Sequence, residues 1–326
     1  MPERLPPRMD IRRGAPLELP HVLLLIDDDK DAILPALGEI AKKADPLYST
    51  HLMMNSGSIT GWFLDVSDQN SGVLTFLTDQ LDELYSRSYS RYDHSFTALV
   101  LGANPFLFAV GDGNHSLAAA KGIWEEYKKS IGSQSLNHEE KTAALGHPCR
   151  YALVEIENIY DPAIQFEPIH RLVFDIGFDE TVSLLSRLPD FSCVNANSAQ
   201  ELANAVRERF DAENTCANCF GVISQGRYAL IKTSASGIAT ACLQPLLDSY
   251  AKDNPQLIDY IHDEKELFRL AEASCEKRKT CGLLLPPVKK SGLFETVARF
   301  GPLPRKSFSM GHSCEKRFYL ESRYLT

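Results

Sequence analysis

The sequence lacks long apolar runs and has no excess of positive charge. Its longest aliphatic runs, residues 22–26 and 283–285, are far shorter than the roughly 20 residues that a membrane-spanning helix needs. Lys and Arg number 34 against 43 Asp and Glu, and the formal net charge of −9 argues against broad nucleic-acid binding. We therefore expect a cytoplasmic protein that has neither a membrane nor a nucleic acid as its partner.

Common nucleotide- and metal-site motifs are missing as well. The chain has no G-x-x-x-x-G-K-[ST] loop, no G-x-G-x-x-G fingerprint, no H-E-x-x-H and no G-x-S-x-G. Eight cysteines are scattered over 326 residues, which excludes a small disulfide scaffold and predicts reduced thiols. The polar, proline-containing N-terminus has no apolar stretch of the kind found in a signal peptide. A content of 44% apolar and 24% charged residues is typical of a globular protein.

Strand-like and helix-like segments alternate, which predicts a mixed α/β (α+β) fold. The expected strands cover residues 21–27, 47–54, 59–66, 98–101, 106–110, 151–157, 171–174 and 282–285, with a hairpin at 219–232. The expected helices cover residues 29–44, 73–86, 114–129, 265–277 and 293–299, and a final helix ends at Tyr324. Residues 130–149 are expected to form a polar loop. We predict two units, residues 1–178 and 179–326, with a segment of about 256–326 returning to the first.

The strongest local signal is the run FLFAVGDGNHSLAAAK at residues 106–121. A buried strand is expected to end in a Gly-Asp-Gly turn, and a helix starts at once. Such a helix start offers free backbone N–H groups to an anion, and the glycines let a phosphate approach the backbone. Asp112 could hold Mg²⁺ or take a proton, and His115 could donate to a phosphate or act in acid–base chemistry. The alternative is an ordinary turn in which Asp112 or Asn114 only caps the helix.

Two further segments carry cationic side chains. In FEPIHRLVF, residues 166–174, His170 and Arg171 precede an apolar strand, and Arg suits contact with a phosphate or carboxylate. The alternative is a structural pair satisfied by Glu167. In LPRKSFSMG, residues 303–311, the cations and hydroxyls could form an anion pocket, although a solvated charged linker has the same composition. The residues concerned are Arg305, Lys306, Ser307 and Ser309.

Two acidic or histidine-containing segments have simpler explanations. Residues 27–29 are three consecutive aspartates after a strand, and they could bind a metal, but carboxylates at a helix start explain them better. His262, in the segment YIHD at residues 260–263, is expected to be a core or capping histidine.

Taken together, these segments resemble the family catalogued as domain of unknown function 1015 (DUF1015). The resemblance covers nearly the whole chain in the same order. Family members usually carry a further N-terminal segment, so this chain is expected to begin inside the family pattern. The more widespread form of the central motif is Asp-Gly-His-His-Arg-Tyr, and Asn114, Ser116 and Leu117 stand here in place of its first His, its Arg and its Tyr. The segments that carry the resemblance are residues 7–28, 52–62, 108–121, 166–171, 258–262, 303–310 and 315–317.

The Asp-Gly-His-His-Arg form is similar to the nucleotide-site motif of free-serine kinases in the ParB/sulfiredoxin-like superfamily. This similarity implies a ParB/sulfiredoxin-like strand–turn–helix core with an additional α/β unit. It also implies ATP or ADP and Mg²⁺ as cofactors, and phosphoryl transfer to a small hydroxyl compound, with L-serine the leading candidate. The implied catalytic residues are Asp112 (also the metal ligand), His115, His170, Arg171 and Lys306. The implied cofactor-binding residues are Gly111, Gly113, Asn114 and Ser116.

Two other functions fit the same residues. One is a nucleotide-responsive regulatory protein without turnover, because Ser116 replaces the Arg of the wider motif. The other is a nucleotide-independent acid–base enzyme that uses His115, His170 and His262. The sequence leaves the substrate, the phosphate donor and the oligomeric state open, as well as whether the motif segments meet in space.

Overall fold

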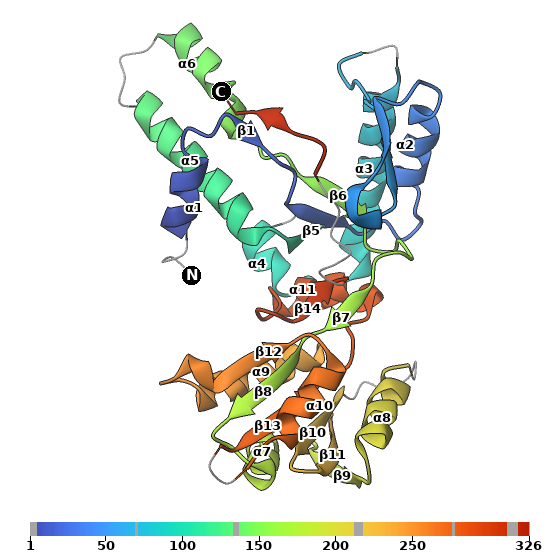
Figure 1. Cartoon of the computed structure of the whole chain (residues 1–326). Helices are drawn as coiled ribbons and strands as arrows, with labels where there is room; N and C mark the ends of the chain where they lie inside the picture. The colour runs from blue at the N-terminus through green and yellow to red at the C-terminus, as the bar shows by residue number, and fades with distance from the viewer. Residues whose placement is uncertain are drawn as a thin grey trace. The chain divides into compact units, whose positions relative to one another are not determined.

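The computed structural model describes residues 5–68, 71–102, 104–132, 137–211, 218–275, 278–311 and 319–325. The chain divides into two compact units (Figure 1). The first unit comprises Met1–Ser90, Pro105–Ala163 and Ser313–Thr326, and the second comprises Arg91–Asn104 and Ile164–His312. The boundary expected at residue 178 thus lies inside the second unit, because the strand that ends at Phe174 is an inner strand of that unit's sheet. Of the C-terminal segment, only residues from 313 onward belong to the first unit.

The first unit contains short strands and longer helices. Its strands are β1 (Leu17–Glu18), β2 (Leu23–Ile26), β3 (Tyr48–His51), β4 (Ser58–Gly61), β5 (Phe108–Asp112), β6 (Glu155–Asn158) and β15 (Arg323–Tyr324). Its helices are α1 (Leu5–Arg12), α2 (Ile33–Ala41), α3 (Val73–Arg91), α5 (Asn114–Gly132) and α6 (His138–Leu145), with 3₁₀ turns η2 (Met53–Asn55) and η3 (Pro148–Arg150).

The second unit is organised around a larger sheet. Its strands are β7 (Phe166–Pro168), β8 (His170–Phe174), β9 (Ser192–Ala196), β10 (Asn218–Ser224), β11 (Arg227–Thr233), β12 (Ile258–Ile261), β13 (Thr280–Leu284) and β14 (Phe308–Met310). Its helices are α4 (Thr97–Leu101), α7 (Phe178–Leu185), α8 (Ala199–Asp211), α9 (Ala239–Tyr250), α10 (Glu264–Glu272) and α11 (Leu293–Phe300), with 3₁₀ turns η4 (Pro255–Leu257) and η5 (Lys290–Gly292).

A three-stranded sheet in the order β5-β2-β6 forms the centre of the first unit. The apolar strand β2 lies between an antiparallel β5 and a parallel β6. Ile26 packs against Ile33 of α2 and Leu84 of α3, so these helices cover the end of β2. Asp28 accepts hydrogen bonds from the backbone N–H groups of Ala32 and Ile33 at 2.7 and 2.8 Å. It therefore caps the start of α2, which confirms the helix-start interpretation of the aspartate run for this residue.

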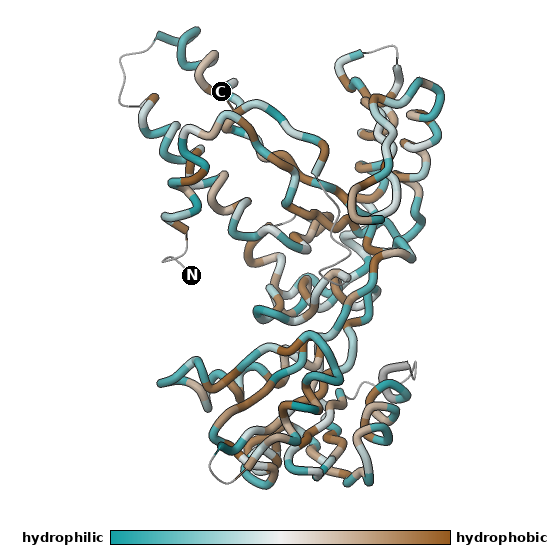
Figure 2. Tube along the Cα trace, in the orientation of Figure 1, coloured by the Kyte–Doolittle hydropathy of each residue, from teal (hydrophilic) through white to brown (hydrophobic). Residues whose placement is uncertain are grey.

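The second unit is a three-layer α/β arrangement. Its six-stranded sheet has the order β12-β8-β13-β10-β11-β9, and each neighbouring pair is antiparallel. Successive side chains of a strand face opposite sides, so Val173 packs with α7 and α9 while Leu172 packs with α8 and α10. Figure 2 shows the apolar residues running along these strands. Burial on both faces explains why β13 is buried throughout.

Three local expectations are wrong. Residues 97–101 form the helix α4 rather than a strand, because a short apolar run carries no periodicity that separates the two. The predicted polar loop contains α6, which begins at a capping box between Asn137 and Glu140. Tyr324 ends a strand rather than a helix, because it pairs with Leu17 of β1.

The mixed α/β class is confirmed by the alternating helices and sheets. Among the described residues, no helix combines the length and the apolar character that crossing a bilayer requires. The cysteines that the structure describes are free thiols.

Candidate functional site

The turn between β5 and α5 brings the Gly-Asp-Gly residues against the start of β2. Asp112 ends β5 opposite Leu23, and α5 begins at Asn114. Between them Gly113 has a φ of +88°. A Cβ added to Gly113 would lie 2.8 Å from the carbonyl oxygen of His21 and 2.8 Å from the Cα of Val22. Both the backbone conformation and the close approach therefore require glycine at this position.

Hydrogen bonds within the turn orient its polar groups. The exposed Asp112 accepts the N–H of Gly113 at Oδ1, at 2.8 Å. The N–H groups of Ser116 and Leu117 donate to the Gly113 carbonyl at 2.9 and 3.0 Å. His115 is half-buried in the first turn of α5. The predicted residues 111–116 thus lie together at the N-terminal end of a 19-residue helix, where the helix dipole favours negative charge.

His21, which precedes β2, adds a polar group beside the turn that the sequence patterns do not indicate. Its Nε2 shares a hydrogen bond with Oγ of Ser116, and its ring meets the ring of Tyr319 edge-on with centroids 6.4 Å apart. His21 is 95 residues from Ser116 in sequence, so no local pattern could have indicated the contact. The hydroxyl of Ser116, which stands where the wider motif has Arg, is thereby engaged by a neighbour.

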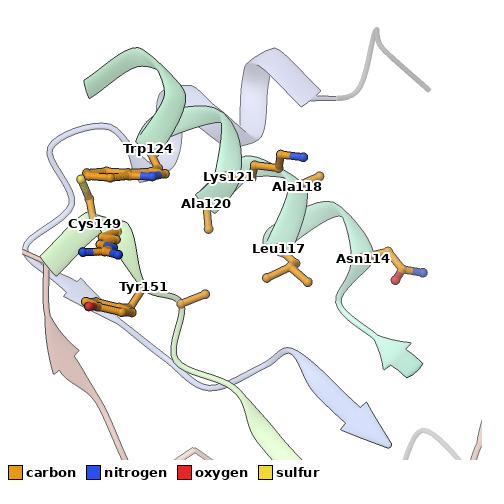
Figure 3. A pocket seen from close by; sticks show the side chains of 10 residues that line it. Asn114, Leu117, Ala118, Ala120, Lys121, Trp124, Cys149 and Tyr151 are labelled. Carbon is orange, nitrogen blue, oxygen red and sulfur yellow. The ribbon is translucent and has the colours of Figure 1, made fainter. Parts of the chain in front are cut away.

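A pocket of about 440 Å³ extends along α5 from Asn114 (Figure 3). Asn114 lies at one end, next to β5, whereas the rings of Trp124 and Tyr151 lie at the other end beside Cys149. Such a volume is within the usual range for small-molecule sites. The full lining consists of Asn114, Leu117, Ala118, Ala120, Lys121, Trp124, Cys149, Arg150, Tyr151 and Ala152.

The pocket combines aromatic rings with positive charge. Lys121 and Arg150 line it, and the Arg150 guanidinium lies 5.5 Å from the centroid of the Tyr151 ring. Burial raises the pKa of the Cys149 thiol, so this group is a protonated wall residue rather than a nucleophile. The lining therefore favours an anionic ligand that also carries a flat, stackable group.

In the second unit, strand pairing brings three of the motif segments together. β12 pairs with β8 so that Tyr260 lies opposite Arg171 and Ile261 opposite His170. β14 pairs with β7, and the rings of Phe166 and Phe308 stack with centroids 4.3 Å apart. One cluster is thus formed by the segments around residues 166–171, 258–262 and 303–310. The predicted site requires two of these, 166–171 and 303–310, to lie together. Residues 315–317 lie outside the described residues.

Arg171 is fully buried and supports the backbone around it. It donates to Oε1 of Gln244 at 3.0 Å, to the Lys306 carbonyl at 3.0 Å and to the Ile169 carbonyl at 2.5 Å. The guanidinium also lies 4.6 Å from the centroid of the Tyr260 ring. Burial lowers the pKa of Arg171 to about 10, so it stays charged at neutral pH. These partners are carbonyls and an amide rather than the Glu167 carboxylate that the structural alternative proposed.

His170 is also buried, and it is neutral at pH 7. Burial, followed by the charge of Arg171, lowers the pKa of His170 to about 4. Its Nδ1 accepts the Leu285 N–H at 3.1 Å. Lys306 is exposed and has a φ of +59°. Burial lowers the pKa of His262, and the positive charge of Lys306 lowers it further. Arg171 therefore positions the turn that carries Lys306, whereas His170 holds the backbone at Leu285.

The structure describes no ready-made metal centre. Within the described ranges, no three His, Cys, Asp or Glu side chains gather as a metal site. Mg²⁺ often binds through one or two carboxylates and completes its shell with water and phosphate oxygens. The exposed carboxylate of Asp112 is compatible with that mode, and phosphate groups would have to supply further ligands.

Fold and site together define a two-unit α/β protein with a strand–glycine turn–helix segment suited to an anionic ligand. A family model described as protein of unknown function (DUF1015) matches residues 1–250. Because the match covers well over half of the 326 residues, the chain belongs to this family. The match includes the β5–α5 turn and residues 166–171 but ends before residues 258–262 and 303–310. Neither curated proteins nor solved structures match the chain.

Proposed function

We propose that the chain binds ATP or ADP in the pocket along α5 and transfers the terminal phosphate, with Mg²⁺, to a small hydroxyl compound. L-serine is the leading acceptor. The observation that carries the proposal is that the predicted turn and the pocket are continuous, since Asn114 belongs to both. A helix N-terminus receives phosphates, and the Trp124 and Tyr151 rings offer stacking surfaces to a base.

The turn residues take their roles from phosphoryl-transfer chemistry, which depends on positioning and charge neutralisation. Backbone N–H groups of Asn114 and His115 cradle the phosphates, while Gly113, whose own N–H donates to Asp112, lets the turn pack against the start of β2. Asp112 binds Mg²⁺ or accepts the proton of the attacking hydroxyl. His115 and Lys121 donate to the phosphate oxygens, and Asn114 supplies a neutral donor in place of the His of the wider motif.

These assignments draw on the similarity to free-serine kinases of the ParB/sulfiredoxin-like superfamily. The β5–turn–α5 arrangement supports that similarity, because it supplies the same strand–turn–helix order around the motif. For the second unit the proposal is narrower. The exposed Arg305 and Lys306 bind an anionic group, while Arg171 holds the turn in place.

Binding of nucleotide is tested first, by titrating ATP, ADP and AMP with and without Mg²⁺. Trp124 lines the pocket, so in a Trp62→Phe background its fluorescence reports ligand binding. Lys121→Gln should weaken ATP binding about tenfold, because the substitution removes one charge-assisted hydrogen bond. Lys129→Gln on the same helix, which does not line the pocket, is the matched control. Equal ATP affinities for the two variants would remove the pocket from the proposal.

Turnover is tested next, by phosphate transfer from ATP or ADP to L-serine. Asp112→Asn should abolish the Mg²⁺-dependent reaction while the melting temperature without ligand stays unchanged, because Asp112 is exposed. Unchanged turnover in Asp112→Asn would contradict the assigned role.

A regulatory protein that binds a nucleotide without turnover is the second candidate. The observation that favours it concerns Ser116, which stands at the position of the motif's Arg. Its neutral hydroxyl is already engaged in a hydrogen bond with His21. Mg²⁺-dependent ATP binding without phosphate transfer to any compound of a small hydroxyl panel would support this function over the kinase.

A further inference from the structure

A second cavity of about 360 Å³ lies in the first unit, on another face of α5. It is bordered by the end of α1, the second half of α5 and the turn at His147. Its polar lining includes Arg12, Arg13, Glu126, Ser130 and His147, and Ile123 and Leu325 are among its apolar residues.

The ionic groups beside this cavity do not balance. Glu18 is buried, and its two carboxylate oxygens receive Arg12 Nη1 and Arg323 Nε, each at 2.7 Å. Two guanidinium groups thus share one carboxylate, and the three groups together carry a net charge of +1. Arg323 directs Nη2 to the backbone carbonyls of Pro148, at 3.0 Å, and Tyr151. Protein atoms therefore engage both Nε and Nη2 of Arg323.

The unbalanced positive charge is concentrated on Arg12. Its side chain is only 13% exposed, and its Nη2 is a buried atom with no hydrogen-bond partner among the described residues. A buried guanidinium nitrogen without an acceptor is costly, and the cost is relieved by an anion. Arg13 is not in this situation, because it is half exposed and pairs with Glu126 at 3.1 Å.

His147 supplies a second donor to the same cavity. Its Nδ1 accepts the Cys149 N–H at 3.1 Å, so in the neutral ring Nε2 carries the proton. The ring is held against Tyr127, with centroids 4.4 Å apart. Arg12 and His147 thus offer two hydrogen-bond donors to one cavity.

We propose that this cavity binds a small organic anion through a carboxylate or phosphate group held by Arg12 and His147. The ligand's short carbon skeleton lies against Ile123 and Leu325. This site is separate from the proposed nucleotide pocket, with which it shares only the Cys149 wall, and it does not rest on the proposed function. Because Nη2 is a buried atom, the Arg12 side chain has to rotate to present it to the ligand.

The test uses succinate and inorganic phosphate as probes, with calorimetry on the full chain at constant ionic strength set by chloride. Arg12→Gln should weaken binding of the preferred probe about tenfold or more, the loss of one charged hydrogen-bond donor. Arg13→Gln removes a cation from the rim of the same cavity and should change the affinity less than about twofold, as expected for an exposed ion pair.

A third variant changes the affinity in the opposite direction. Glu18→Gln removes the one carboxylate that pairs with Arg12 in the described part of the chain, so it should tighten anion binding severalfold, which a purely structural role for Glu18 would not do. Preference for succinate assigns a carboxylate ligand, and preference for phosphate assigns a phosphate ligand. The proposal is overturned if neither probe binds the wild type, or if Arg12→Gln and Arg13→Gln bind equally well. ATP titration of Arg12→Gln should remain at the wild-type value, which separates this site from the nucleotide pocket.

Discussion

Replacing Gly113 by alanine tests the central feature of the candidate site. Gly113 has a φ of +88°, and an added Cβ would lie 2.8 Å from two backbone atoms of residues 21 and 22. Backbone atoms at that distance cannot move aside without shifting the start of β2. The substitution should therefore displace the β5–α5 turn from the strand next to it and distort the phosphate-binding end of the pocket.

The expected cost has two parts. A non-glycine residue in a left-handed conformation costs about 1–2 kcal/mol, and overpacking adds about 1–3 kcal/mol, so the free energy of unfolding should fall by about 2–5 kcal/mol. Gly57 provides a matched control, because its φ is +86° and nothing lies within 4 Å of an added Cβ. Gly57→Ala should pay the conformational cost of about 1–2 kcal/mol alone.

Trp62 and Trp124 are the two tryptophans of the chain, and both belong to the first unit. Guanidinium unfolding followed by tryptophan fluorescence therefore reports the stability of that unit. Gly113→Ala should also lose nucleotide binding, whereas Gly57→Ala should retain it. If the two variants are destabilised equally, the close approach of the turn to β2 contributes nothing and our reasoning about the site is refuted.

Two predictions concern the second unit. The folded state holds the pKa of His170 at about 4 against its ordinary 6.5. At a pH between these two values, the His170 ring therefore binds a proton in the unfolded chain but not in the folded chain. Stability should therefore fall by about 3 kcal/mol as the pH is lowered from 6.5 to 4, and His170→Asn, which can still accept the Leu285 N–H, should lose this slope in thermal unfolding followed by circular dichroism. Arg171→Met leaves the Lys306 carbonyl and Gln244 Oε1 without their donor, and should cost about 2–4 kcal/mol. Hydrogen exchange of β8 and β12 would report this loss, and unchanged exchange would show that the guanidinium is not needed to hold the Lys306 turn.

Much of the fold follows from local patterns. The aliphatic run at residues 23–26 and the Gly-Asp-Gly punctuation before Asn114 place β2, β5 and α5 correctly, because a buried strand and a helix start have short-range signals. The pattern of residues 97–101 is ambiguous between strand and helix at that length, and the segment is the helix α4 rather than the expected strand. The unit boundary also differs from the one expected at residue 178, since the long-range pairing of β8 with β12 and β13 has no local signature.

The sequence by itself determined the family, the mixed α/β class and the positions of the motif segments, because these depend on residue types at fixed spacing. Only the tertiary structure decided what the side chains do. Strand pairing buried Arg171 and His170 and gave them backbone partners, and a contact across 95 residues joined His21 to Ser116. The imbalance of Arg12, Arg323 and Glu18 arises in the same way, since groups more than 300 residues apart share one carboxylate. Charge, burial and hydrogen-bond partners are properties of the neighbourhood that folding assembles, and local patterns in the sequence do not specify that neighbourhood.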